Sequence, residues 1–194
     1  MNYRLLVAVL SFVALALSVE IVSAHVVVKP SQVNVATFQT FSIGVPNEKD
    51  IAVTGLRLTI PSGLKDVTPT VKPGWTISTK TSGDDITEID WTGGTVPAGL
   101  RDDFSFSAQA PDNTTTLNWK AYQTYADNTI VAWDQDPSSI PSGQEGTPYS
   151  KTVVVNDLAA TPLTPWVNRP TTHWLTALVG IIAVGAFLLA LRRR

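Results

Sequence analysis

Apolar and polar residues alternate along the middle of the chain. Leu117, Trp119 and Ala121, for example, alternate with the polar residues Asn118 and Lys120. A repeat of two residues is typical of β-strands that bury one face. The pattern predicts strands over residues 25–29, 38–46, 54–61, 75–80, 86–91, 104–111, 116–125, 129–134 and 151–156.

Short segments rich in turn-forming residues separate these strands, among them PSG, KPGW, SGDD, PAG, PDN and ADN. Eight or nine short strands at this spacing favour a β-sandwich, and no part of the region has a sustained helical period. We therefore predict an all-β fold, a single antiparallel β-sandwich of the immunoglobulin- or cupredoxin-like type, over residues 25–157.

The N-terminal segment has the features of a cleaved signal peptide. Arg4 precedes a long apolar run, which ends in Val22-Ser23-Ala24, a small-x-small cleavage pattern. We expect residues 1–24 to be removed, which makes His25 the first residue of the mature protein. The alternative is an uncleaved membrane anchor.

The C-terminal segment predicts a membrane anchor. Residues 158–172 contain several prolines and are expected to form an extended linker. Residues 173–191 carry no acidic side chain, Lys or Arg, and three arginines follow at 192–194. An uncharged stretch of this length predicts a transmembrane helix, and the arginines predict a cytoplasmic tail. The β-sandwich would then lie on the extracytoplasmic side of a cell membrane, in an arrangement typical of bacteria.

Composition excludes several classes of function. Residues 25–170 contain ten Lys and Arg against fifteen Asp and Glu, a net charge of minus five, and no basic patch that would suit nucleic acid. The chain has no cysteine, and its one methionine is Met1. Thiolate and thioether ligands for Cu(I) are therefore absent from the predicted mature chain.

An N-terminal histidine offers two metal-binding nitrogens from one residue. The α-amine titrates near pH ~8 and the imidazole near ~6.5, so both can lose a proton near neutral pH. A pair of nitrogens suits Cu(II), which has the highest affinity in the divalent series. The other interpretation of His25 is an ordinary surface residue at the cleavage site. The second histidine of the chain, His173, lies at the expected membrane edge.

Further ligands would have to be carboxylates, and strand geometry suggests one. If the strands over 25–29 and 38–46 pair antiparallel with a turn near Val35, residue 25 lies opposite residues around 45. Glu48 then lies beside the mature N-terminus. A connection that crosses between sheets remains the alternative to a hairpin.

Several segments, read together, resemble the YcnI-like family of exported copper-binding domains. They are AHVVVKP, VPNEKD, KPGW, IDWTGG, PAGLRDDFSFSAQAPD, WKAYQTYADNTIVAWD and VVVN, in this order and over residues 24–156. The resemblance implies that a mature N-terminal histidine binds Cu(II) through its amine and its ring, an arrangement called a mono-histidine brace. A carboxylate completes the site, and a tryptophan lies nearby.

Transferred to this sequence, the resemblance makes His25 the brace residue, Glu48 of VPNEKD the carboxylate and Trp133 of IVAWD the neighbouring tryptophan. Glu88 and Asp134 are the alternative carboxylates. A tryptophan at the end of a strand is also a common packing residue, so Trp133 has a structural interpretation as well.

The sequence thus predicts a membrane-anchored Cu(II)-binding protein that acquires, buffers or transfers copper, with other copper-handling proteins as possible partners. We expect no enzymatic activity. A polysaccharide-oxidising copper enzyme would need a second histidine in the ectodomain, and His25 is alone there. The alternative function is a non-catalytic carbohydrate- or protein-binding module at the cell surface, with exposed tryptophans as its contact platform.

Overall fold

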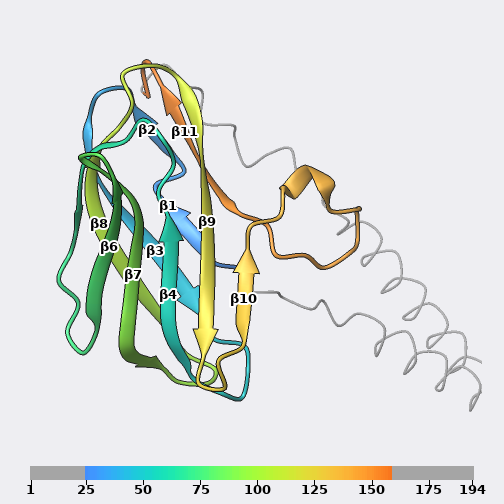
Figure 1. Ribbon diagram of the computed structural model, residues 1–194. Helices are drawn as coiled ribbons and strands as arrows, with labels where there is room; N and C mark the ends of the chain where they lie inside the picture. Colours follow the sequence, from blue (N-terminus) through green and yellow to red (C-terminus); the bar gives the residue numbers. More distant parts are fainter. Residues whose placement is uncertain (1–24, 159–194) are drawn as a thin grey trace, which may run out of the picture. The chain divides into compact units, whose positions relative to one another are not determined.

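The computed structural model describes residues 25–158, which form a sandwich of two β-sheets (Figure 1). The signal peptide predicted over residues 1–24 and the transmembrane helix predicted over 173–191 lie outside the described residues. Within residues 25–158, no helix is long and apolar enough to cross a membrane. Residues 25–158 correspond to the predicted ectodomain.

The smaller sheet contains four strands in the order β1-β3-β8-β5. The strand β1 is at the edge of this sheet and pairs only with β3 there. The bounds are β1 (Val27–Lys29), β3 (Phe38–Pro46), β8 (Arg101–Gln109) and β5 (Lys65–Pro69).

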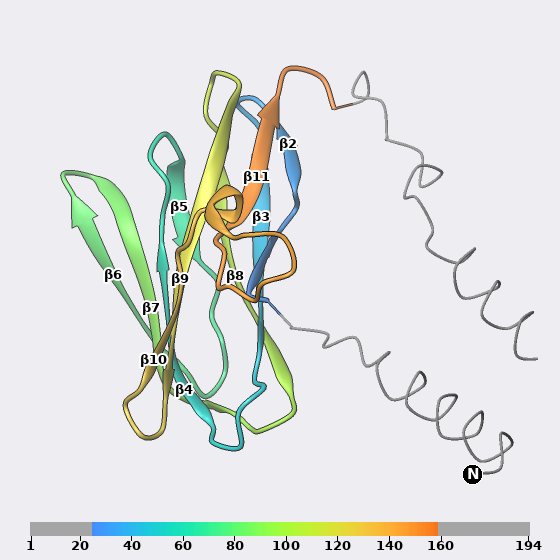
Figure 2. The same ribbon diagram turned by 90° about the vertical axis from the view of Figure 1, so that its right-hand side faces the viewer.

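The larger sheet contains seven strands, six of them in the order β2-β11-β9-β4-β7-β6, and β10 pairs with β9. The strands β11 and β10 occupy successive parts of one edge of β9, as Figures 1 and 2 show. A short 3-10 helix, η1 (Pro137–Ser139), lies between β10 and β11 in the chain. The strand bounds are β2 (Gln32–Asn34), β4 (Val53–Thr59), β6 (Thr76–Ser82), β7 (Asp85–Val96), β9 (Thr115–Tyr125), β10 (Ile130–Trp133) and β11 (Ser150–Val155).

Two strands were not predicted from the sequence. The strand β2 has three residues and buries only Val33, and β5 is largely exposed. Neither gives the alternation of several apolar residues by which strands are recognised. The strand over 38–46 has the predicted bounds, and the others agree with prediction within a few residues at their ends, apart from β7, which continues five residues further.

The expected antiparallel topology needs one correction. The strands β2 and β11 are parallel, with Val33 opposite Val154. Because β2 lies between β1 and β3 in the sequence but in the other sheet, the connection from β1 to β3 crosses between the sheets. The pairing of β1 with β3 is nevertheless antiparallel, as predicted.

Aromatic rings from both sheets form the centre of the core. Phe41 of β3 and Phe106 of β8 stack with their ring centroids 5.3 Å apart. Trp119 of β9 packs against both rings, at 5.1 Å from Phe41 and 5.8 Å from Phe106. All three are buried, and such offset and tilted contacts are favourable beyond the area that they bury. This cluster joins the two sheets without a disulfide.

Candidate metal centre

The strand β1 fixes the position of His25. Val26 and Val28 are buried, and Val27 lies opposite Gly44 of β3. On its other side, the backbone N–H of Val28 donates to the Ser150 hydroxyl of β11 at 3.0 Å. The strand β1 is therefore hydrogen-bonded on both sides. This holds the half-buried His25, two residues before the strand, in a defined place.

His25 packs against Trp133, as the resemblance predicted for a neighbouring tryptophan. The two ring centroids are 5.4 Å apart, with an angle of 59° between the ring planes. Trp133 is the last residue of β10 and lies opposite Ala121, whose side chain is buried. Since opposite residues in a ladder point to the same face, the Trp133 ring points into the sandwich. It is only 6% exposed and contacts the imidazole.

A buried glutamine connects Trp133 to the smaller sheet. The indole N–H of Trp133 donates to Gln123 Oε1 at 2.5 Å, and Gln123 Nε2 donates to the Pro46 carbonyl at 2.8 Å. Sequence reasoning missed Gln123. The signal was available, because Gln123 is a polar residue on a face of β9 otherwise occupied by Leu117 and other apolar side chains.

Strand register relates Glu48 to His25. Val27 pairs with Gly44, and a ladder continued by two residues would set His25 opposite Pro46, within one residue of the predicted position. Glu48 is exposed and follows Pro46 by two residues. The buried Asn47 shapes the turn, because its amide donates to the carbonyls of Ile51 and Val96, both at 2.9 Å.

The carboxylate of Glu48 affects a neighbouring phenol. Burial raises the pKa of Tyr125, and the negative charge of Glu48 raises it further. The cation of the next residue, Lys49, lies 4.1 Å from the centroid of the same ring. Glu48 therefore lies near the end of β9 that carries Gln123 and Tyr125.

The two alternative carboxylates are bound elsewhere. Glu88 forms ion pairs with Lys80 and with Arg57, the latter at 3.7 Å. Asp134 follows Trp133 directly but accepts a hydrogen bond from the Tyr122 hydroxyl at 3.3 Å. Neither of these contacts involves His25.

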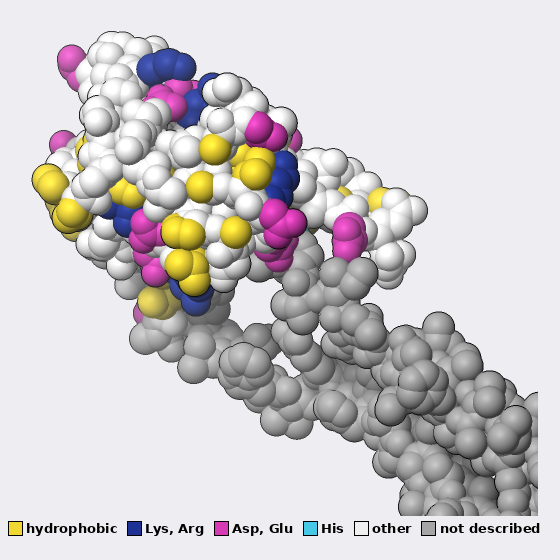
Figure 3. All heavy atoms as spheres, turned by 90° about the horizontal axis from the view of Figure 1, so that it is seen from below, with side chains coloured by type: hydrophobic (Ala, Val, Ile, Leu, Met, Phe, Trp, Pro, Cys, Tyr) yellow, Lys and Arg dark blue, Asp and Glu magenta, His cyan; other side chains and the backbone are white. Residues whose placement is uncertain are grey.

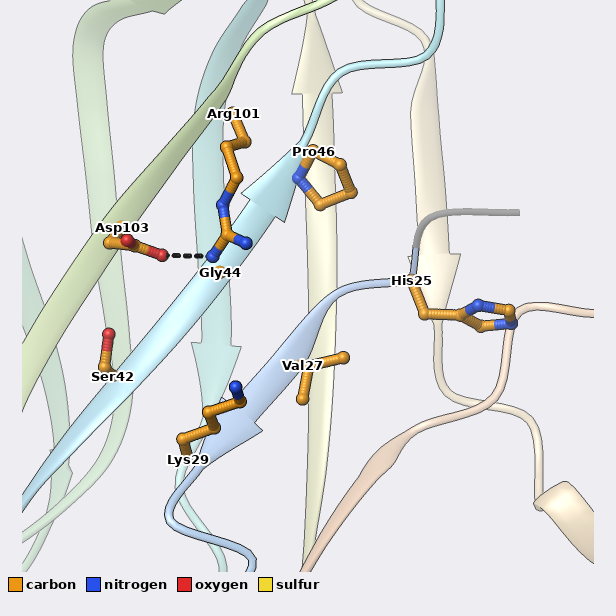
Figure 4. Close-up of a pocket in the computed structure, with 8 residues that line it drawn as sticks. All are labelled: His25, Val27, Lys29, Ser42, Gly44, Pro46, Arg101 and Asp103. Atoms are coloured by element: carbon orange, nitrogen blue, oxygen red, sulfur yellow. Dashed lines mark hydrogen bonds and ion pairs between the residues drawn. The ribbon is translucent and has the colours of Figure 1, made fainter. Parts of the chain in front are cut away.

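A groove on the outside of the smaller sheet extends from His25 across β1, β3 and β8 (Figure 4). Its volume is about 380 Å³, and Figure 4 shows the His25 ring at its margin, turned away from Lys29. Gly44 leaves the space that Arg101 occupies, because a Cβ there would lie 2.4 Å from the guanidinium. Arg101 pairs with Asp103 at 2.6 Å. The groove thus carries charges of both signs, and His25 lies at its margin.

Charges of both signs also mix elsewhere on the surface. Figure 3 shows the end of the sandwich at which β9 ends and β10 begins, where acidic and basic side chains are interspersed with small apolar areas. This end carries no continuous basic surface of the kind that suits nucleic acid.

The predicted copper site would use few donors from the described residues. Among residues 25–158, no group of three or more His, Cys, Asp or Glu side chains is arranged to hold a metal ion. The predicted ligand set needs only one imidazole, one α-amine and one carboxylate. The structure brings His25 and Trp133 into contact, and it places Glu48 on the turn after Pro46.

Comparisons with known proteins identify a family, a copper-binding relative and a protein of similar fold. The sequence profile of a family described as "Domain of unknown function (DUF1775)" matches residues 25–151. The copper-binding protein CutI of Bacillus subtilis (strain 168) is 32% identical over 136 residues, which cover 69% of this chain and 64% of CutI. A protein of Nocardia farcinica with an immunoglobulin-like fold superposes with a TM-score of 0.59 at 25% identity, over 69% of this chain and 99% of that one.

Proposed function

This chain belongs to the DUF1775, or YcnI-like, family, and on that premise we propose that it is an extracytoplasmic Cu(II)-binding protein. The observation that carries the proposal is the packing of His25 against the buried Trp133. The large Trp133 ring and the hydrogen-bonded strand β1 hold the His25 imidazole in place, ready to bind a metal ion. A relative that covers most of the domain is named for copper binding.

His25 supplies two of the proposed ligands. Removal of residues 1–24 would convert the amide nitrogen of His25 into an amine, which can bind Cu(II) together with the ring Nδ1. Both nitrogens must be deprotonated to bind Cu(II), so protons compete with the metal and acid weakens copper binding. Glu48 is the proposed carboxylate, because it lies two residues after the end of β3, the strand that pairs antiparallel with β1.

Trp133 has a protective role in this proposal. Its ring contacts the His25 ring and would keep water from that side of a bound metal. Bound Cu(II) supplies charge and redox chemistry, while the residues of this chain hold and shield it. We propose no catalytic role for them.

The remaining parts of the proposal concern location and partners. Residues 158–172 would link the domain to a transmembrane helix over 173–191, with residues 192–194 in the cytoplasm. A copper site on the outer side of a bacterial membrane suits acquisition, buffering or transfer of copper to other copper-handling proteins.

The alternative function, a glycan- or protein-binding module, depended on exposed tryptophans. Within residues 25–158, Trp91, Trp119 and Trp133 are buried, and Trp75 is partly buried against Phe104. The described domain therefore offers no fully exposed indole, and the copper proposal is better supported.

The deciding experiment compares two forms of the mature protein that differ by one residue. The first begins at His25, and the second carries one additional glycine before it. We expect the glycine to weaken Cu(II) binding by about 100-fold or more, or ~2.8 kcal/mol, because the α-amine is displaced from the chelate. Competition titration and electron paramagnetic resonance (EPR) measure the effect. Equal affinity of the two forms would contradict the proposed site.

A further inference from the structure

Gln123 is a fully buried polar side chain whose two hydrogen bonds both lead to the candidate site. It is 0% exposed. Its carbonyl oxygen accepts from the Trp133 indole at 2.5 Å, and its amide donates to the Pro46 carbonyl at 2.8 Å. Trp133 contacts His25, and Pro46 ends β3, the strand that pairs with β1, two residues before Glu48.

Packing alone does not explain why residue 123 is an amide. Burying an amide without partners costs about 1–3 kcal/mol in proteins, and an apolar side chain of similar volume would fill the same space. Gln123 avoids the cost because both of its polar groups are bonded. Its bonds join the larger sheet, through Trp133 of β10, to the end of β3 in the smaller sheet.

We propose that Gln123 is a positioning residue of the copper site, an inference that rests on the function proposed above. One hydrogen bond holds the Trp133 ring at the angle at which it contacts His25. The other holds the end of β3, from which the turn with Glu48 begins. Gln123 thereby sets the distance between the covering ring and the carboxylate-bearing turn before any metal arrives.

Residues that position metal ligands from outside the ligand set have measurable effects. Their substitution typically changes metal affinity or activity by about 10–100-fold. The Gln123→Met variant keeps the length and approximate volume of the side chain and loses both hydrogen bonds. In the full mature protein beginning at His25, we expect Cu(II) affinity to fall about 10-fold and the copper hyperfine coupling in EPR to change.

The structure offers a matched control on the neighbouring strand. Thr152 of β11 is also 0% exposed, accepts from the Trp119 indole at 3.0 Å and donates to the Pro30 carbonyl at 2.7 Å. Thr152→Val removes an equivalent pair of buried bonds. We expect it to lower thermal stability while Cu(II) affinity and the EPR spectrum stay as in the unmodified protein. A fall in copper affinity as large as that of Gln123→Met would overturn the positioning role.

A second variant guards against misfolding of the first. Gln123→Glu has nearly the same shape, and burial favours its neutral acid, which can accept from the Trp133 indole and donate to Pro46. We expect a smaller loss of Cu(II) affinity than in Gln123→Met. Unmodified affinity and spectrum in both folded Gln123 variants would overturn the proposal.

A metal-free measurement distinguishes this inference from the proposed function. If the unmodified protein does not bind Cu(II) through His25, the proposed function fails, and the positioning role can still be tested by NMR. Nuclear Overhauser contacts between the His25 and Trp133 rings should be present in the unmodified protein and in Thr152→Val. They should weaken in Gln123→Met, and contacts of full strength in that variant would overturn the inference.

Discussion

Two hydrogen-bonded bridges cross the sandwich from β9 and its neighbours, and their chemistry is the same. In the Thr152 bridge (Trp119, Thr152 and Pro30), an indole N–H donates to a buried side chain, which donates to a proline carbonyl. The Gln123 bridge (Trp133, Gln123 and Pro46) repeats this sequence of bonds. Each bridge connects the larger sheet to a proline next to the smaller sheet. Pro46 is the last residue of β3, and Pro30 directly follows β1.

The bridges differ in what the tryptophan contacts. Trp119 packs against Phe41 and Phe106 in the centre of the core. Trp133 packs against His25 at the start of the first strand. The same hydrogen bonds thus support packing in one place and a candidate ligand in the other, so the neighbours of a buried polar residue decide its role.

The largest expected difference between the bridges comes from removal of the imidazole. His25→Ala should reduce Cu(II) affinity by on the order of 1,000-fold, about 4 kcal/mol, because the ring ligand is lost. The free energy of unfolding should change little, since His25 is only partly buried. Competition titration and chemical denaturation give the two numbers, and retention of tight copper binding would contradict the site.

The next largest effect is on stability, and here the bridges should behave alike. Thr152→Val and Gln123→Met each leave an indole N–H and a proline carbonyl without a partner. Each should lower the free energy of unfolding by about 1–3 kcal/mol. Urea denaturation of the metal-free proteins measures this. A loss confined to one variant would show that the two bridges are not energetically equivalent.

Fluorescence should separate the two tryptophans. Cu(II) at His25 would lie close to Trp133 and should quench its emission more strongly than that of Trp119, which packs within the central core. Removing the Trp133 indole with Trp133→Phe should therefore abolish most of the copper-dependent quenching, whereas Trp119→Phe should abolish little. Titration of both variants with Cu(II) gives the comparison, and equal quenching in the two would place the metal elsewhere.

The smallest effect is a shift in the titration of Tyr125, which lies two residues beyond Gln123. Burial and the charge of Glu48 raise its pKa above the usual 10.0. The unfolded chain therefore loses this proton first, and the contribution of Tyr125 to stability declines as the pH rises above about 10. Glu48→Gln should lower the pKa of Tyr125 in the folded protein and so make this decline smaller. Ultraviolet titration of the phenol checks the shift, and an unchanged pKa would mean that Glu48 does not act on it.

Local pattern was sufficient to predict most of the fold. The alternation around Leu117, Trp119 and Ala121 is observed, with all three buried. The strand β2 was missed because one buried valine gives no periodic signal, and its parallel pairing with β11 depends on residues more than a hundred positions away.

For the candidate site, the sequence singled out His25 by the cleavage pattern before it, and the antiparallel pairing of β1 with β3 was predicted correctly. Trp133 was inferred only from a family resemblance, because its contact with His25 joins residues far apart in the chain.

The sequence by itself determined an all-β domain with its strands in order, a histidine behind a cleavage pattern and a ligand set without sulfur. These properties depend on neighbouring residues, and local chemistry is enough to read them. Only the tertiary structure decided that the connection from β1 to β3 crosses between the sheets, that Trp133 contacts His25 and that Gln123 bonds to Trp133 and Pro46. These contacts join residues from distant strands, and their partners are chosen by the packing of two sheets rather than by any local pattern.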